Sequence, residues 1–288
     1  MRLRKATRDD CEIIFSWRND PLTREMFLNN EIISFENHLS WYESSLSNPY
    51  RYIYIGENEN NKFGVCRFDY DQGTKASDIS ININPLFRGK GLSQEFLLEA
   101  IDLYELEIES TLKANIKKEN IPSQTIFKKA GFSSIYQDEK IIKFERLFHE
   151  ISYKKVESDD AEELYKLLKN RKFSISHKNL PSFNEHKKFV KSIPYKEWYI
   201  IYQNSIAIGT FYIQYDNSIG LNLDKPCLRI VKNISEYIRT NFEPSPPVPS
   251  KVPPYFFINI AESNTRMLNI LKVIGCKTLQ LSFKLYES

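Results

Sequence analysis

The sequence predicts an α/β (α+β) protein with two tandem domains, each with a mixed, mostly antiparallel central sheet flanked by helices. Three observations support this prediction. The chain has 288 residues, of which 41% are hydrophobic and 14% aromatic, enough for two domains with real cores. Strand and helix patterns alternate along the first half. The second half then repeats the motifs of the first in the same order. We place the domains at residues 1–148 and 149–288.

The elements of the first half follow from local patterns. Residues 2–8 alternate as a short strand, and Asp9 and Asp10 cap a helix that ends before Pro21, because proline disfavours helical geometry in the preceding residue. Ser34 caps a second helix. Later patterns predict strands at 51–55, 63–70, 78–84, 111–116, 132–136 and 141–147, with helices after the glycines near 90 and at 122–130.

The internal repeat keeps its order throughout. Four pairs of segments match: 7–12 with 157–162, 34–38 with 182–186, 79–84 with 219–224, and Asn120 and Gly131 with Asn264 and Gly275, which have the same spacing. We therefore predict a duplicated domain, with a proline-rich surface loop at 242–254 in the second copy.

Composition and charge exclude several classes of protein. The net charge is +3, with 20 basic against 23 acidic residues in 1–149 and 20 against 14 in 150–288. Without a dense basic stripe, we expect no nucleic-acid partner. No apolar run approaches the ~18 residues of a membrane span and residues 1–5 lack a signal-peptide core, so we expect a cytoplasmic protein. Four scattered cysteines favour free thiols and no metal site.

The stretch 84–93 is the most informative one for function. It reads Asn-Pro-Leu-Phe-Arg-Gly-Lys-Gly-Leu-Ser, between an alternating strand and an amphipathic helix. A glycine turn that opens a helix leaves backbone N–H groups for an anion such as phosphate. Gly89 and Gly91 allow close approach, and Arg88 and Lys90 add charge. The alternative is an ordinary helix start with turn glycines.

The spacing of Arg88-Gly89-Lys90-Gly91-Leu92-Ser93 resembles the Arg/Gln-x-x-Gly-x-Gly/Ala pyrophosphate loop of the GNAT superfamily of acyl-CoA N-acyltransferases. It fits neither a Walker loop nor a dinucleotide fingerprint. Ser93 departs mildly from the family's Gly or Ala. The resemblance covers residues 1–147 and implies acetyl-CoA, or another acyl-CoA, as cofactor. It implies that Arg88, Gly89, Lys90, Gly91, Leu92 and Ser93 take the pyrophosphate.

The same resemblance implies further cofactor contacts. Backbone around Ile81, Asn82 and Ile83 would bind the pantetheine arm and stabilise the oxyanion. Asn120-Ile121-Pro122-Ser123 resembles the family's Asn-x-x-Ser, in which Asn120 contacts the cofactor; plain helix capping is the alternative for both polar residues. Phe127 stands where family members often have a cofactor-side tyrosine, and it cannot donate a proton.

For catalysis, Asp78 stands where many family members carry an acidic general base, although an exposed strand-end carboxylate is the alternative. With Phe127 unable to act as acid, Ser123, water or another tyrosine would serve, or the thiolate leaves unassisted. His38 could be a base, but a structural histidine beside Trp41 is favoured, because its repeat partner His186 lies in the second half.

The segment Trp17-Arg18-Asn19-Asp20 and the later Ser-Phe-x-x-His-x-x-Trp resemble a GNAT branch that acetylates nucleotide-linked amino-deoxy sugars, and also the branch that acetylates ribosomal-protein N-termini. Trp17, Arg18 and Arg67 would contact such an acceptor, although Trp17 also fits a core role. We expect sugar N-acetylation for a surface glycan. A protein N-terminal or small-amine acetyltransferase and a non-catalytic acyl-CoA-binding scaffold stay open, as does a homodimer.

The second half lacks the features of that loop. Residues 225–229 read Lys-Pro-Cys-Leu-Arg, with no glycine, and Pro226 lacks an N–H. We therefore expect residues 149–288 to form a degenerate GNAT-like domain without the pyrophosphate loop.

Overall fold

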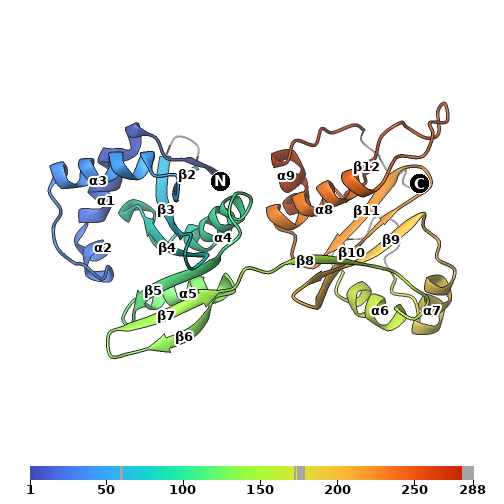
Figure 1. The fold of residues 1–288 in the computed structure, drawn as a ribbon, viewed down its shortest axis with the longest axis horizontal. Coiled ribbons are helices and arrows are strands. Elements are labelled where there is room, and N and C mark those ends of the chain that lie inside the picture. The colour runs from blue at the N-terminus through green and yellow to red at the C-terminus, as the bar shows by residue number, and fades with distance from the viewer. Residues whose placement is uncertain (59–60, 172, 174–178, 281–288) are drawn as a thin grey trace, which may run out of the picture. The chain divides into compact units, whose positions relative to one another are not determined.

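Two units make up the chain, Met1–Phe148 and His149–Ser288 (Figure 1). The computed structural model describes residues 1–58, 61–171, 173 and 179–280. Each unit has one mixed sheet with helices against it, so the predicted α/β fold class is confirmed.

The first unit has a seven-stranded sheet in the order β1-β2-β3-β4-β5-β7-β6. All neighbours are antiparallel except β4 and β5, which are parallel. The strands are β1 (Arg2–Lys5), β2 (Arg51–Asn58), β3 (Asn61–Asp71), β4 (Ala76–Ile83), β5 (Thr111–Lys117), β6 (Ser133–Gln137) and β7 (Ile141–Arg146). The helices are η1 (Arg8–Asp10), α1 (Cys11–Asn19), α2 (Pro21–Met26), α3 (Phe35–Ser47), η2 (Pro85–Phe87), α4 (Leu92–Tyr104) and α5 (Ile121–Lys129).

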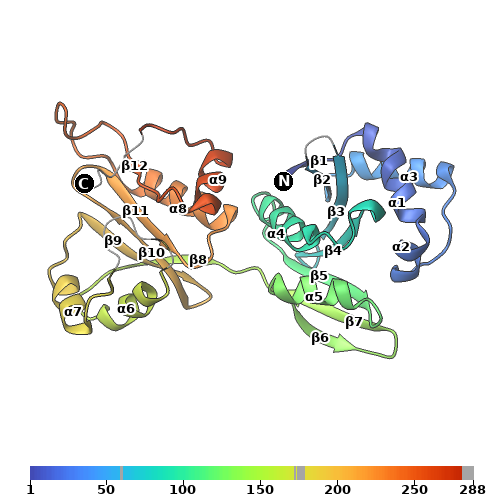
Figure 2. The same cartoon turned by 180° about the vertical axis from the view of Figure 1, so that it is seen from behind.

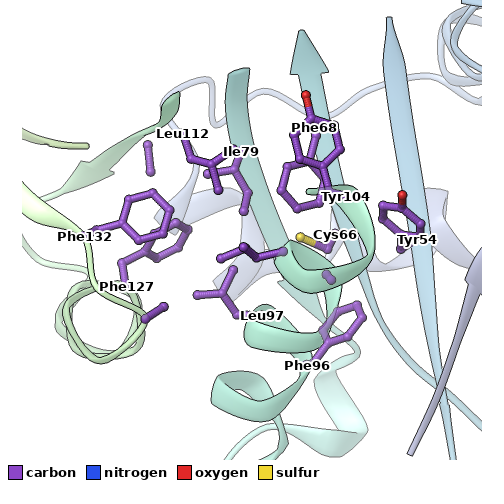
Figure 3. Packing of buried hydrophobic residues seen from close by; sticks show 14 of the residues in the cluster. Tyr54, Cys66, Phe68, Ile79, Phe96, Leu97, Tyr104, Leu112, Phe127 and Phe132 are labelled. Atoms are coloured by element: carbon purple, nitrogen blue, oxygen red, sulfur yellow. The ribbon is translucent and has the colours of Figure 1, made fainter. Parts of the chain in front are cut away.

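A hydrophobic layer lies on each face of this sheet. On one face α4 and α5 cover the strands, and the rings of Phe68 and Tyr104 stack there at 4.2 Å between centroids (Figure 3). On the other face α1 and α3 bury Trp17 and Tyr42 against β2. Figures 1 and 2 show α4 and the α1–α3 segment on opposite sides of the sheet.

Helix α2 is the main element of the first unit that the sequence reasoning missed. Pro21 was expected only to end the preceding helix. The structure shows that Pro21 also begins the next one, because the Asp20 carboxylate caps α2 by accepting the Thr23 N–H at 2.9 Å. Aspartate before proline is a common helix start, since proline at the first helical position lacks only an N–H that would be unpaired anyway.

The second unit has a five-stranded sheet in the order β12-β11-β10-β9-β8. This matches β5-β4-β3-β2-β1 of the first unit, and the one parallel pair, β11 with β12, falls at the same place. The strands are β8 (Ile151–Lys155), β9 (Glu197–Gln203), β10 (Ile206–Ile213), β11 (Ser218–Leu223) and β12 (Phe257–Ile258). The helices are α6 (Ala161–Lys169), α7 (Phe183–Lys191), α8 (Leu228–Asn241) and α9 (Thr265–Val273).

Within the described ranges, no helix has the length and apolar character to cross a membrane. The same ranges contain no group of three or more His, Cys, Asp or Glu side chains that could hold a metal ion. All four cysteines are free thiols.

Candidate active site

Strands β4 and β5 are paired over a short length and then separate. Their partners are Ala76 with Thr111, Ser77 with Leu112, and Asp78 with Lys113. Both strands continue, to Ile83 and to Lys117, but the described structure has no pair between them beyond Asp78. We call the space between residues 79–83 and 114–117 the opening. A strand edge without a partner presents alternate backbone N–H and C=O groups, so the opening suits an extended ligand.

The register determines which β4 residues face the opening. The Asn84 N–H donates to the Phe63 carbonyl of β3 at 2.9 Å, and bonding directions alternate along a strand. The backbone of Ile81 and Ile83 therefore faces the opening. The backbone of Asn82 faces β3, so the predicted set is corrected at this residue. The Asn82 side chain instead accepts a hydrogen bond from Thr23 Oγ1 at 3.4 Å.

The loop after β4 has room for an anion. Gly89 and Gly91 have φ of +74° and +75°, a region that side chains rarely adopt. A Cβ at either position would have no atom within 4 Å. Gly91 is the N-cap of α4, and Leu92 and Ser93 follow in its first turn, where N–H groups lack helical partners. These residues fit a diphosphate.

The two cations of the loop are held by neighbours. Arg88 Nη2 donates to Asp20 Oδ2 at 2.6 Å and also to the Thr23 hydroxyl. Partial burial opposes ionisation of Asp20, but the Thr23 N–H and the Arg88 guanidinium outweigh it and lower the pKa of this carboxyl. Lys90 Nζ lies 4.5 Å from the centroid of the Phe87 ring. The sequence reasoning missed Asp20 and Thr23, although the Asp-Pro helix start was a usable signal.

Asp78 is exposed and lies at the last paired position before the opening. Its neighbours across the sheet are Asp69 on β3 and Lys113 on β5. Although the residue is exposed, the surrounding protein partly desolvates its carboxylate. This desolvation and the charge of Asp69 raise the pKa of Asp78, and Lys113 opposes the shift. A carboxylate with a raised pKa beside the opening is suited to proton transfer.

At the start of α5, the predicted capping role is confirmed, since Asn120 Oδ1 accepts the Ser123 N–H at 3.1 Å. The Ser123 side chain is half-buried. The structure corrects the prediction for Phe127. Its side chain is 2% exposed and its ring contacts Phe132, with centroids 4.9 Å apart, in the core of the unit (Figure 3). The phenylalanine that replaces the family's tyrosine is therefore a core residue.

The three predicted acceptor residues have different surroundings. Trp17 is buried in the core, which agrees with the alternative core role given above. It also lines a pocket of about 480 Å³, together with Asp20 and Asn84. Arg18 Nη2 donates to the Asn29 carbonyl at 2.7 Å, and its guanidinium lies over Phe27, so this side chain contacts the loop after α2. Its predicted contact with the acceptor stays a prediction.

Arg67 lies on the same face of the sheet as Asp78. Its guanidinium is 5.5 Å from the centre of the Trp41 ring and pairs with Asp69 at 2.9 Å. His38 is buried and its Nε2 is 3.1 Å from the Cys11 carbonyl. Burial lowers the pKa of His38, which agrees with the predicted structural role.

The second unit differs at the positions that correspond to Asp78, Ser80 and Arg67. Ser218 stands where the first unit has Asp78, and Gly220 stands opposite Tyr212 where the first unit has Ser80 opposite Arg67. Tyr212 stacks on Tyr195 at 3.9 Å between centroids, so aromatic rings cover this face. The segment before α8 contains no glycine.

An opened parallel strand pair that leads into a glycine turn and a helix N-terminus is a site for an extended arm ending in a diphosphate, as in acyl-CoA transferases. Residues 1–133 match the family model described as "Acetyltransferase (GNAT) domain". A curated relative from Bacillus subtilis (strain 168), "Putative phosphinothricin acetyltransferase YwnH", is 30% identical over 140 residues, which cover 46% of this chain and 84% of the relative. The chain therefore belongs to the GNAT acetyltransferase family. It is an acyl-CoA N-acyltransferase whose cofactor is acetyl-CoA or another acyl-CoA.

Solved structures with a similar fold include one that contains CoA and one that contains acetyl-CoA. Spermidine N-acetyltransferase from Vibrio cholerae, in complex with CoA and spermine, is 16% identical with a TM-score of 0.46, over 51% of this chain and 95% of that one. The yncA protein of Salmonella typhimurium, with acetyl-CoA, is 20% identical with a TM-score of 0.45, over 52% and 95%.

Proposed function

We propose that the first unit carries the single acyl-CoA site of the chain and acetylates the amino group of a nucleotide-linked amino-deoxy sugar, for a surface glycan. The observation that carries the proposal is the position of Asp78. It is the last β4 residue paired with β5, so its carboxylate stands at the edge of the opening, on the face where Arg67 and Lys113 also lie.

The residues around the opening then have distinct roles. When bound, the cofactor supplies a thioester whose acyl group forms a C–N bond with the acceptor amine while its C–S bond breaks. Asp78 takes the proton that the amine loses. The N–H groups of Ile81 and Ile83 face the opening. One of them donates to the acyl oxygen, where negative charge develops, and the other holds the pantetheine arm. Ser123 or water returns a proton to the thiolate.

Cations near Asp78 support an acceptor with its own phosphates. Arg67 and Arg51 both lie over the ring of Trp41, at 5.5 and 5.7 Å, and both pair with Asp69. Lys113 adds a third positive charge beside Asp78. Guanidinium groups suit phosphate recognition, and the Trp17–Asp20 motif resembles the amino-sugar branch. Arg18 contacts the Asn29 carbonyl through Nη2, and its contact with the acceptor stays part of this proposal.

A second candidate acceptor is a small free amine, such as the phosphinothricin in the name of the relative. The same cations would bind an anionic group on a small molecule. A protein N-terminus and a non-catalytic acyl-CoA-binding role are further alternatives, and the acceptor experiment below separates them.

We infer that the second unit is a duplicated GNAT-like domain without a working site. It keeps the strand order and the short parallel pair of the first unit. It lacks a carboxylate at position 218 and glycines before α8, and Tyr212 and Tyr195 stack where a polar face would be needed. We propose that this unit serves as a structural partner.

The test is an assay of acetyl transfer by the 288-residue chain, in which the thiol released from acetyl-CoA is measured. The acceptors are a UDP-linked 4-amino-deoxy sugar, phosphinothricin, spermidine and a peptide with a free N-terminus. We expect the sugar to be preferred and Asp78→Asn to lower kcat about 100-fold or more, while Asp9→Asn, an exposed aspartate outside the site, has no effect. Turnover of another amine alone would overturn the sugar assignment. Cofactor binding without any turnover would favour the scaffold role.

A further inference from the structure

Helix α2 and its N-cap contact Arg88 of the loop and one residue on each strand that borders the opening. At its start, Asp20 holds the loop residue Arg88 at 2.6 Å. Within it, Thr23 receives a hydrogen bond from Arg88 and donates to Asn82 of β4 at 3.4 Å. At its end, the Glu25 carbonyl accepts from Lys117 Nζ of β5 at 2.8 Å. Six residues of chain therefore connect the loop and both strands that border the opening.

The contact with Arg88 leaves part of its guanidinium available. Both hydrogen bonds that this side chain makes to described residues use Nη2. A guanidinium has five N–H donors in a fixed plane, so Nε and Nη1 keep three for another acceptor. Asp20 and Thr23 hold one edge of the plane, which fixes the direction of the other. Thr23 is buried, and the carboxylate and the hydroxyl come from a capped helix, so neither partner is a freely moving side chain.

We propose that Asp20 and Thr23 are positioning residues for the cofactor diphosphate, which act by orienting Arg88 and by holding the glycine loop against β4. The proposal rests on the cofactor site described above. Its physical basis is preorganisation, because a guanidinium already held in one orientation loses less entropy on binding a phosphate than a free one.

The opposite effect of Asp20 is also physically reasonable. A carboxylate paired with Arg88 competes with an incoming diphosphate for the same cation and repels it. In that case removal of Asp20 would tighten binding. The two effects have opposite signs, so one substitution distinguishes them. Asp20→Asn is suitable, because asparagine caps a helix as well as aspartate and should preserve α2.

The experiment is calorimetric titration of the 288-residue chain with CoA and with S-acetylpantetheine, which lacks the nucleotide diphosphate. We expect Asp20→Asn to weaken CoA binding about tenfold, the size of one charge-assisted hydrogen bond, and to leave S-acetylpantetheine unchanged. We expect Thr23→Val to weaken CoA binding. Thr23→Ser is the matched control, because it keeps the hydroxyl and should therefore keep the affinity. In an Arg88→Ala background, Asp20→Asn should have no further effect.

Three results would overturn the proposal. The first is that Asp20→Asn binds CoA more tightly than the wild type. The second is that Asp20→Asn loses equal affinity for CoA and for S-acetylpantetheine. The third is that the losses of CoA affinity from Asp20→Asn and Arg88→Ala add in the double variant. Circular dichroism of each variant checks that the fold is intact, and a misfolded Asp20→Asn leaves the Thr23 pair to decide. If the wild type bound neither ligand, the cofactor site itself would be in error, which separates that failure from this one.

Discussion

Asp69 and Asp78 stand directly opposite each other on β3 and β4, and only Asp69 is paired with arginines. Like charges at facing positions of a sheet disfavour ionisation. Arg51 and Arg67 both form ion pairs with Asp69. Partial burial and then the charge of Asp69 raise the pKa of Asp78. The pair therefore adjusts the proton affinity of the proposed base.

The first prediction concerns the pH dependence of the reaction. Asp78 works as a base only when ionised, so its raised pKa moves the acid limb of the kcat/KM profile upward. Asp69→Asn should move this limb to lower pH. Lys113→Met should move it to higher pH, because Lys113 lowers the pKa of Asp78. Both profiles would be measured from pH 4 to 9 with one acceptor. Shifts in the same direction would contradict the proposed base.

The second prediction concerns cofactor binding at the glycine loop. Gly91→Trp should abolish binding of acetyl-CoA, because the indole fills the open space at this position and the φ of +75° disfavours a side chain. Calorimetry should give one site per wild-type chain and none in the variant. Gly275→Trp is a matched control, since Gly275 has a φ of +93° and open space in the second unit. Two sites in the wild type would refute a degenerate second unit.

The third prediction concerns a buried carboxylate. Asp10 is fully buried and binds Arg4 at 2.7 Å, Lys62 at 2.7 Å and the Thr7 N–H at 2.8 Å. Burial acts against ionisation, but these partners hold the pKa of Asp10 far below its usual range. The stabilisation is therefore present above pH ~4, the unfolded pKa, and lost as pH falls below it.

Asp10→Asn should lower the free energy of unfolding at pH 7 by about 3 kcal/mol, because two cations lose their buried partner. Urea unfolding followed by circular dichroism would measure it. Asp160, its counterpart in the second unit, pairs with Lys154 and accepts the Glu157 N–H at 2.9 Å. With one cation rather than two, Asp160→Asn should cost less. Equal losses would show that the second cation contributes nothing.

The fourth prediction concerns a glycine of the second unit that has no room. A Cβ on Gly220 would lie 1.9 Å from Cζ of Tyr212, whose ring stacks on Tyr195. Gly220→Ala should therefore destabilise this unit by about 1–3 kcal/mol, typical of overpacking. Adding Tyr212→Ala should recover part of the loss. Acetyl-CoA affinity in the first unit should be unchanged in both variants, and a loss of affinity would mean that the second unit contributes to the site.

Local chemistry made much of the first unit predictable. The glycine spacing and the strand before it predicted the turn at Gly89 and Gly91 and the helix that follows, because these conformations are set within a few residues. Which neighbouring strand the Asn82 backbone faces depends on the pairing register between β4 and β3. The burial of Phe127 depends on its contact with Phe132. The pairing of Asp20 with Arg88 joins residues 68 positions apart. No local pattern encodes such a contact, so only the folded chain reveals it.

Only three residue pairs join β4 to β5 in the described structure, so the sheet of the first unit consists of two parts that meet along a short seam, the β4–β5 boundary. Strands β1–β4 form one part and β5–β7 the other. At the seam, the amides of Ile81 and Ile83 have no strand partner among the described residues. A bound pantetheine arm would act as a substitute strand there and join the two parts, so the enzyme should be stiffest while it holds its donor. If the bound cofactor joins the two parts of the sheet, adding CoA should slow amide hydrogen exchange at Ile81 and Ile83.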